Sequence, residues 1–438
     1  METYFRDLAQ TLCAAILPQE TLLLNYDGET SDFVRFNQNK IRQAGNVRQQ
    51  YLQLDLIAKQ RQSTATLPLC GDRARDETQA VKVIAGLREQ LAVIPDNPHI
   101  NYALAVHDSR DAADSALPSP YAAVDDIIGR AQGLDLVGIW ASGQQLRGFA
   151  NSLGQFNWHA RASFNFDWSV YQNSDKAVKS NYAGTQWNNG VLEQKLNYSR
   201  EVQTVLARPA IKLKPGRYRV FLTPSALNEI MTLLNWGAFG LKSHRTLQTP
   251  LIKMIKEAAR LQRQVHLVEH HADGLAPRFT RQGFAKPERV ALIEKGEYRD
   301  CLANARDAKE YGVEVNCAIE HPQSLHMAGG DLSQADVLRE LGTGIYISNL
   351  WYCNFSDRNN CRITGMTRFA SLWVENGEAI APIDVMRFDE SVYHFLGDKL
   401  VALTAEREHI LDTGTYEKRS DASALLPGAL VEDFAFTL

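Results

Sequence analysis

Two histidines and a glutamate in the run HLVEHH have the spacing in this sequence that most directly suggests chemistry. His266, Glu269 and His270 follow the order H-x-x-E-H, in which two imidazoles can hold a zinc ion while the carboxylate polarises a bound water molecule. Spacing i to i+4 brings both imidazoles to one metal ion when the run is helical. A zinc hydrolase is therefore the first hypothesis that the sequence raises.

The residues around this run favour a strand over a helix. In QVHLVEHHADG, His266 and His270 fall on one face and Leu267 and Glu269 on the other, an alternation of period two. Two strand residues four positions apart are about 13 Å apart at about 3.3 Å per residue, too far to share one ion. We therefore predict a polar edge strand here and keep zinc binding by His266 and His270 as the weaker alternative.

Other residue types that carry chemistry are scattered. His244, His321, His326 and His409 each stand alone in loop-like sequence, and we expect them at the surface or held by a local hydrogen bond. No G-x-S-x-G turn for a nucleophilic serine and no glycine-rich phosphate loop occurs. The six cysteines form no C-x-x-C pair, so they indicate neither a zinc ribbon nor a disulfide framework.

Composition and charge exclude several classes of partner. The 438 residues suffice for two or three domains, and the net charge of −4 lacks the basic surplus typical of nucleic-acid-binding proteins. No apolar run approaches the roughly 20 residues that span a bilayer, and the start METYFRDLAQTLCAAIL lacks the basic region of a signal peptide. We expect a cytoplasmic protein that binds neither nucleic acid nor membrane.

Hydrophobic patterning predicts an α+β protein. Apolar residues at helical spacing predict helices over 4–16, 77–93, 121–132, 225–239 and 250–262. Alternating or aromatic runs predict strands over 21–27, 32–44, 52–56 and 134–172, and again through most of the C-terminal third. Asn376-Gly377 supplies the positive φ angles of a tight hairpin turn.

Several stretches of the C-terminal third together resemble the signature of a known family. They are GIYI (344–347), TG (364–365), TRF (367–369) and WVENGE (373–378) followed by Pro382. Weaker matches lie in RGFANSLG (147–154), in ALIEKGEYRDCLANARDAKEYG (291–312) and in the closing stretch 410–437. In this order the stretches resemble the TldD/TldE (PmbA) family of zinc-peptidase-related proteins.

The resemblance implies a fold and an activity. It implies an N-terminal α/β domain with trailing strands, which we assign to 1–200, and a C-terminal antiparallel β-rich, barrel-like domain of TldD/PmbA type over 201–438. It also implies dimers that enclose a cavity. In the TldD branch, a helix with H-E-x-x-x-H and a cysteine near the C-terminus bind zinc, and the dimer cuts unfolded peptides.

This sequence departs from the TldD pattern at each expected zinc ligand. Asn228 and Glu229 stand where His-Glu is expected, and Leu233 stands where the second histidine is expected. The run HILDTGTYEKRS (409–420) contains no cysteine. Asparagine is a weak zinc ligand and leucine is none. The chain therefore resembles the metal-free TldE/PmbA branch, with no catalytic residue and no cofactor of its own, and zinc is expected in a TldD-like partner.

The expected role is to hold substrate in a shared cavity. An unfolded peptide can add a strand to an open sheet edge, where backbone hydrogen bonds give affinity without sequence preference. The residues expected to contact the cavity or the peptide are Asn235, Asn349, Trp351, Tyr352 and Arg368.

Two alternatives stay open at this point. One is a homodimeric peptide-binding or interaction protein without a proteolytic role. The other is an active peptidase with a rearranged zinc site, in which His266, His270 or His244 supplies ligands.

Overall fold

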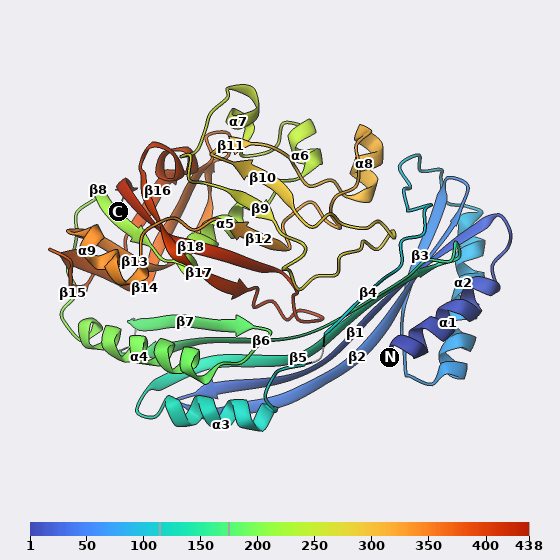
Figure 1. Ribbon diagram of the computed structural model, residues 1–438, viewed down its shortest axis with the longest axis horizontal. Coiled ribbons are helices and arrows are strands. Elements are labelled where there is room, and N and C mark those ends of the chain that lie inside the picture. The colour runs from blue at the N-terminus through green and yellow to red at the C-terminus, as the bar shows by residue number, and fades with distance from the viewer. Residues whose placement is uncertain (114, 174–175, 438) are drawn as a thin grey trace.

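The structure, a computed structural model, describes residues 1–113, 115–173 and 176–437. Within these residues each half of the chain builds one large β-sheet, and helices pack against both sheets (Figure 1). No described helix is both long enough and apolar enough to cross a membrane.

The first sheet comes from the N-terminal half, and its long central strands are antiparallel. Among the described residues the order is β3-β2-β1-β5-β6-β4, and β7 also pairs with β6. The strands are β1 (Glu20–Asn37), β2 (Lys40–Ala58), β3 (Arg61–Pro68), β4 (Ser109–Ala112), β5 (Asp135–Asn151), β6 (Phe156–Tyr171) and β7 (Ala177–Gly184). The two strands predicted over 21–27 and 32–44 are therefore parts of β1 and β2, and the turn lies at Gln38-Asn39, where both φ angles are positive.

In the described part of the N-terminal half, the helices pack on one face of this sheet. They are α1 (Glu2–Ala14), α2 (Arg73–Leu91), α3 (Pro120–Arg130) and α4 (Asn189–Leu206). The β6 side chains that pack with α3 and α4 are apolar: Phe164, Phe166, Trp168 and Val170. The alternate β6 side chains are small or polar and face the C-terminal half, which lies across the sheet from α3 (Figure 1): Ser163, Asn165, Asp167 and Ser169.

The second sheet curls until it closes on itself. Its order is β11-β10-β9-β12-β18-β16-β14-β13-β8, and β8 also pairs with β18, so five described strands form a closed ring. The strands are β8 (Gly216–Leu222), β9 (Leu267–Glu269), β10 (Val290–Glu294), β11 (Glu297–Tyr298), β12 (Ser324–Met327), β13 (Gly344–Asp357), β14 (Arg362–Glu375), β15 (Glu378–Pro382), β16 (Arg387–Ser391), β17 (Leu400–Leu411) and β18 (Ser423–Phe436). The predicted α+β fold with a barrel-like second part is confirmed.

Short helices fill and flank the curled sheet. They are α5 (Pro224–Leu234), α6 (Leu241–Arg245), α7 (Ile252–Lys256), α8 (Ala305–Tyr311) and α9 (Val337–Leu341), with single turns η1 (Gln334–Asp336) and η2 (His394–Asp398). The predicted helices 225–239 and 250–262 end early, because Gly237 and Ala258 adopt positive φ angles that stop a helix. The hairpin turn predicted at Asn376-Gly377 is confirmed.

A long helix joins the two sheets. Residues 189–206, for which we predicted no helix, form α4. Leu192 and Leu196 in its first half pack with the first sheet, and Val202 and Leu206 in its last turns pack with the second. A domain boundary at residue 200 would fall inside this shared helix, and the division into 1–200 and 201–438 stays a proposal.

Candidate functional site

The start of α5 is fixed to β13 by a helix cap and two hydrogen bonds. The side chain of Thr223 accepts a hydrogen bond from the Ala226 amide, and Pro224 occupies the first turn, both favourable at a helix N-terminus. The Thr223 hydroxyl donates to the Ser348 carbonyl at 2.6 Å, and the Thr223 amide donates to the Ile347 carbonyl at 3.1 Å. The direction of α5 inside the curled sheet is therefore set by the backbone of β13.

The three positions that match the family's zinc helix differ in their surroundings. Leu233 is 4% exposed and packs in the core of the curled sheet. Asn228 is half-buried and Glu229 is exposed in part. Burial against neighbouring protein atoms nevertheless raises the pKa of Glu229, with Asp167 raising it further and Lys179 opposing the change. Glu229 therefore looks toward β6 and β7 of the first sheet, whereas Leu233 looks into the core.

The donor atoms at α5 do not fit a zinc site. An amide, one carboxylate and a buried leucine lack the imidazole and thiolate ligands that zinc prefers. Among the described residues, the one group of His, Cys, Asp and Glu with metal-ligand spacing contains no residue of α5. We therefore derive no chemical step through a metal ion at this helix.

A cavity of about 540 Å³ with a mixed apolar and polar lining lies between the two halves. One wall consists of residues from β1, β2, β5 and β6, and the other is the segment from Leu411 to Ser420 at the end of β17 and beyond it. Wall residues with polar or charged groups include Arg35, Arg42, Asn165, Asp167, Thr413 and Arg419. Within the described part of the chain, the buried Asn165 Oδ1 atom accepts no hydrogen bond. This oxygen is enclosed by protein atoms, so a ligand in the cavity would reach it only after the Asn165 side chain turns.

Four residues that the sequence predicted as substrate contacts form one patch on β13 and β14. The Arg368 guanidinium lies 4.3 Å from the centre of the Trp351 ring, and Tyr352 packs edge-on against Trp351 at 5.3 Å. Asn349 lies opposite Arg368 in the strand register. Trp351, Tyr352 and Arg368 are exposed, whereas Asn349 is buried. None of the four is in the wall of the 540 Å³ cavity as the described residues define it.

The fifth predicted contact lies apart from the β13–β14 patch in the sequence. Asn235 caps the C-terminus of α5 and is half-buried. Its Oδ1 atom accepts no hydrogen bond among the described residues. Whether any of these five residues contacts a peptide stays a prediction.

The HLVEHH run forms an interior strand of the second sheet, in which Glu269 has a structural role. Residues 267–269 form β9, so the strand predicted from the alternation is confirmed. The predicted polar edge position is wrong, because β9 pairs with β10 on one side and with β12 on the other and its Leu267 and Glu269 are buried. The Glu269 side chain is 1% exposed, and its carboxylate accepts from the amides of Gln323 and Ser324 at 3.0–3.1 Å and lies 3.1 Å from His271 Nδ1. This carboxylate therefore holds β9 to the start of β12, and it is not free to polarise water.

The histidines that we considered as ligands are separated by the fold. His266 and His270 flank β9 at opposite ends, and His266 is not in the metal-spaced group that contains His270. Both ring nitrogens of His244 are used, one near the Tyr298 hydroxyl at 2.9 Å and one near the Ala238 carbonyl at 2.6 Å. Burial lowers the pKa of His244, as for a neutral imidazole in a local hydrogen-bond network.

Comparison with known proteins completes the description. Residues 215–438, just over half of the chain, match the family model described as the PmbA/TldA metallopeptidase C-terminal domain. TldE from Thermococcus kodakarensis is similar in structure, with a TM-score of 0.79, 14% identity, and coverage of 99% of this chain and 100% of that one. No curated protein matches the sequence significantly.

Two further solved structures share the fold. A proposed modulator of a DNA gyrase from Thermotoga maritima has a TM-score of 0.75 at 13% identity and covers 100% of both chains. Another from Bacteroides thetaiotaomicron has a TM-score of 0.72 at 16% identity, covering 99% of this chain and 98% of that one. These likenesses concern the fold, and the family match concerns the sequence. Together they show that this protein belongs to the TldD/TldE (PmbA) family.

Proposed function

We propose that this chain is the zinc-free, TldE/PmbA-like subunit of a cytoplasmic TldD/TldE-type metallopeptidase that acts on unfolded peptides. The proposal rests on the residues that occupy the two positions of α5 where histidines were expected. Asn228 stands in place of one imidazole, and Leu233, in place of the other, is part of the hydrophobic core. In this proposal zinc belongs to a TldD-like partner, where it would polarise the peptide carbonyl and a water molecule.

The contribution of this chain would be to bind and orient the peptide. The cavity wall offers the half-buried Asn165 side-chain amide as a partner for peptide backbone groups and the exposed Arg35 and Arg42 as donors for carbonyl groups. Small side chains at Ser163 and Ser169 leave room for varied peptide side chains. Contacts to the peptide backbone of this kind would accept many sequences.

The experiment is to assay hydrolysis of an unstructured, fluorescently labelled polypeptide by this chain, by a zinc-bearing TldD-like subunit, and by their mixture. We expect hydrolysis by the mixture and none by this chain alone, with or without added zinc. Asn165→Trp, which fills the cavity, should lower the rate of the mixture at least tenfold. Tyr121→Ala, on the opposite side of the first sheet, is the matched control and should leave it unchanged. Hydrolysis by this chain alone would refute the proposal.

A homodimeric peptide-binding or interaction protein without a proteolytic role is the second candidate. It is favoured by the exposed patch of Trp351, Tyr352 and Arg368, since aromatic and arginine side chains are enriched where proteins meet. Light scattering of the purified chain distinguishes the two. A self-dimer that Trp351→Ala dissociates, and that does not exchange with a TldD-like subunit, would favour the second candidate.

A further inference from the structure

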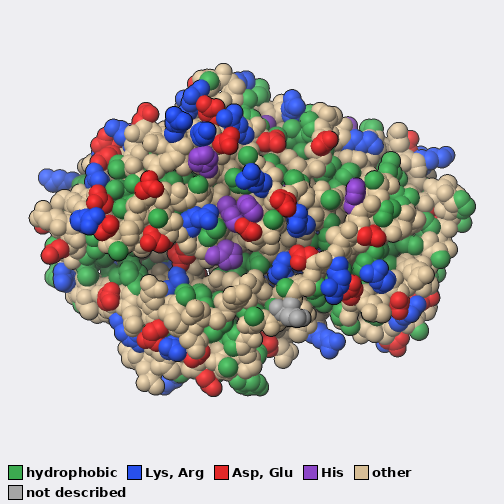
Figure 2. All heavy atoms as spheres, in the orientation of Figure 1, with side chains coloured by type: hydrophobic (Ala, Val, Ile, Leu, Met, Phe, Trp, Pro, Cys, Tyr) green, Lys and Arg blue, Asp and Glu red, His purple; other side chains and the backbone are tan. Residues whose placement is uncertain are grey.

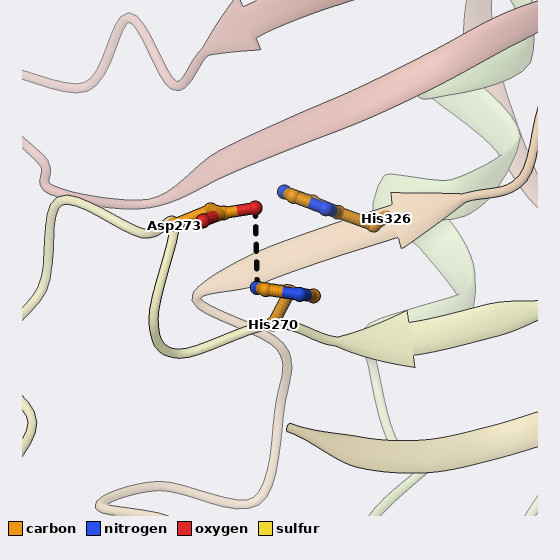
Figure 3. Close-up of side chains that lie close together, drawn as sticks. All are labelled: His270, Asp273 and His326. Carbon is orange, nitrogen blue, oxygen red and sulfur yellow. Dashed lines mark ion pairs between the residues drawn. The ribbon is translucent and has the colours of Figure 1, made fainter. Parts of the chain in front are cut away.

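Three potential metal ligands converge at the end of β9, away from α5. His270 directly follows β9, His326 lies on β12, and Asp273 lies on the turn that leaves β9. One ligating atom from each lies within 4.8 Å of the other two. Figure 3 shows the two imidazole rings one above the other, with one nitrogen of each turned toward the Asp273 carboxylate.

The geometry of these three side chains suits a bound cation better than direct hydrogen bonds among them. The rings of His270 and His326 are stacked, with centroids 4.8 Å apart and planes 13° apart. His270 Nδ1 is buried and 3.4 Å from the Asp273 carboxylate, and it makes no hydrogen bond in the part of the chain that the structure describes. Two stacked rings and a carboxylate thus lie side by side, and the one other polar neighbour of these rings at this distance is the Ser324 hydroxyl, 3.5 Å from His326 Nε2 in the described part of the chain.

The backbone beneath the cluster is held firmly. The His270 amide donates to the Ser324 carbonyl at 2.9 Å, and the buried Glu269 carboxylate accepts from the Ser324 amide. His326 pairs with Val268 in the antiparallel register of β9 and β12. Glu269, next to His270 in sequence, therefore fixes the separation of the two strands that carry the imidazoles. Residues that surround a metal site commonly position its ligands in this way.

The cluster is open to solvent on the side of Asp273, where an ion can reach it. The side chain of Asp273 is 64% exposed, so its carboxylate can move toward an ion. Figure 2 shows histidine side chains gathered on this face of the molecule, over the region of β9 and β12 in Figure 1.

We propose that His270, Asp273 and His326 form a binding site for one divalent transition-metal ion of the zinc class, with a fourth position open to water. Imidazole and carboxylate ligands lie about 2.0–2.2 Å from zinc, so neighbouring ligands of a tetrahedral ion are about 3.3 Å apart. Closing a spacing of up to 4.8 Å to this value takes shifts of up to about 1.5 Å, together with a tilt of the stacked rings toward the ion. This ligand set has His326 and Asp273 where the H-x-x-E-H motif suggested His266. The proposal does not rest on the proposed peptidase role.

The site would join the turn after β9 to β12. An ion that binds the folded chain and not the unfolded one adds stability that grows with the concentration of free ion. The ion would therefore raise the unfolding temperature of the whole chain. It leaves the proposed role of α5 and the cavity untouched.

The first experiment is a titration of the metal-free full-length chain with Co²⁺, followed by its visible d–d absorption, and then with Zn²⁺ in competition. We expect one equivalent bound and a rise in unfolding temperature on addition of either ion. His270→Ala, His326→Ala and Asp273→Ala should each weaken binding at least tenfold. Asp273→Ala tests the site without risk to the fold, because its side chain is largely exposed.

His266→Ala is the matched control, since His266 lies on the same strand face at the other end of β9. It should leave the affinity unchanged. Absence of a stoichiometric ion, or binding that survives both histidine substitutions in the cluster, would overturn the proposal, as would binding lost in His266→Ala. Partner-dependent hydrolysis is measured separately, so failure of the metal site and failure of the proposed function are distinguishable.

Discussion

Replacing Arg419 with methionine tests how the segment between β17 and β18 is held against the first sheet. The Arg419 side chain is 5% exposed, and its guanidinium donates to the Ser31 hydroxyl and the Gly143 carbonyl at 2.9 Å and to the Ser163 carbonyl at 3.2 Å. The Glu29 carboxylate, 3% exposed, lies 3.5 Å away. Methionine keeps much of the volume of the side chain but removes its charge and its donors.

The expected cost follows from the charge that is left behind. Removing one partner of a buried ion pair typically costs about 3–5 kcal/mol. Ser31 and Gln49 still donate to Glu29, so we expect the lower end, a loss of about 3 kcal/mol in the free energy of unfolding. Adding Glu29→Gln removes the orphaned charge and should restore about 1–2 kcal/mol of that loss.

Urea unfolding followed by tryptophan fluorescence measures both variants. Lys418→Met is the matched control, because Lys418 is the neighbouring residue and its partly exposed ammonium lies 3.3 Å from Asp27. Exposed pairs of this kind contribute about 0–1 kcal/mol. The reasoning fails if Arg419→Met costs no more than Lys418→Met, or if Glu29→Gln does not improve the Arg419→Met chain.

Three further changes test other parts of the structure. Burial, with the neighbouring Asp307 adding to it, raises the pKa of Glu320 to about 7. The folded form therefore holds this proton more tightly, and stability should fall as pH rises from about 5 to 8, by about 1–2 kcal/mol after solvent screening. Glu320→Gln should remove that slope in urea unfolding measured across this range. Leu233→Ala should lower the free energy of unfolding by about 2–4 kcal/mol, and a loss below 1 would contradict its core position. Gly143→Ala should cost more than about 2 kcal/mol and lower the melting temperature, since its Cβ would lie 2.1 Å from the Thr30 carbonyl oxygen.

The fold class could be predicted from the sequence, but the strand boundaries could not. The run GETS (28–31) looks like a turn between two strands, yet β1 passes through it. There β1 is paired on both sides, with β2 and with β5. Backbone hydrogen bonds along both edges of β1 outweigh the local preference of this run for a turn. This pairing depends on distant parts of the chain, so it cannot be predicted from the segment alone.

The missed helix α4 is a different case, since its signal is present in the sequence. Leu192, Leu196 and Ser199 are buried at helical spacing, followed by Val202 and Leu206. This pattern identifies an amphipathic helix without tertiary information. The polar face of β6 could likewise be read from the alternation in SFNFDWSV, where small or polar residues follow aromatic ones.

The grouping of His270 with His326 could not be predicted from spacing. The two residues are far apart in the sequence, and only the antiparallel register of β9 and β12 brings them together. Local sequence points to His266 instead, because it completes a known motif. The strand keeps His266 and His270 apart, and the neighbouring strand β12 places His326 beside His270 instead. A sequence motif is therefore informative only together with the secondary-structure element that carries it.

The position of α5 in the fold does not depend on a metal ion. The Thr223 cap and the buried Leu227, Ile230 and Leu234 set the position of α5, and none of them would be a metal ligand. The helix therefore needs no imidazole ligand to hold its place. Leu233 adds apolar burial to the core, and a histidine in its place would bury an imidazole in a hydrophobic cluster. The packing around Leu233 thus opposes a metal ligand at this position.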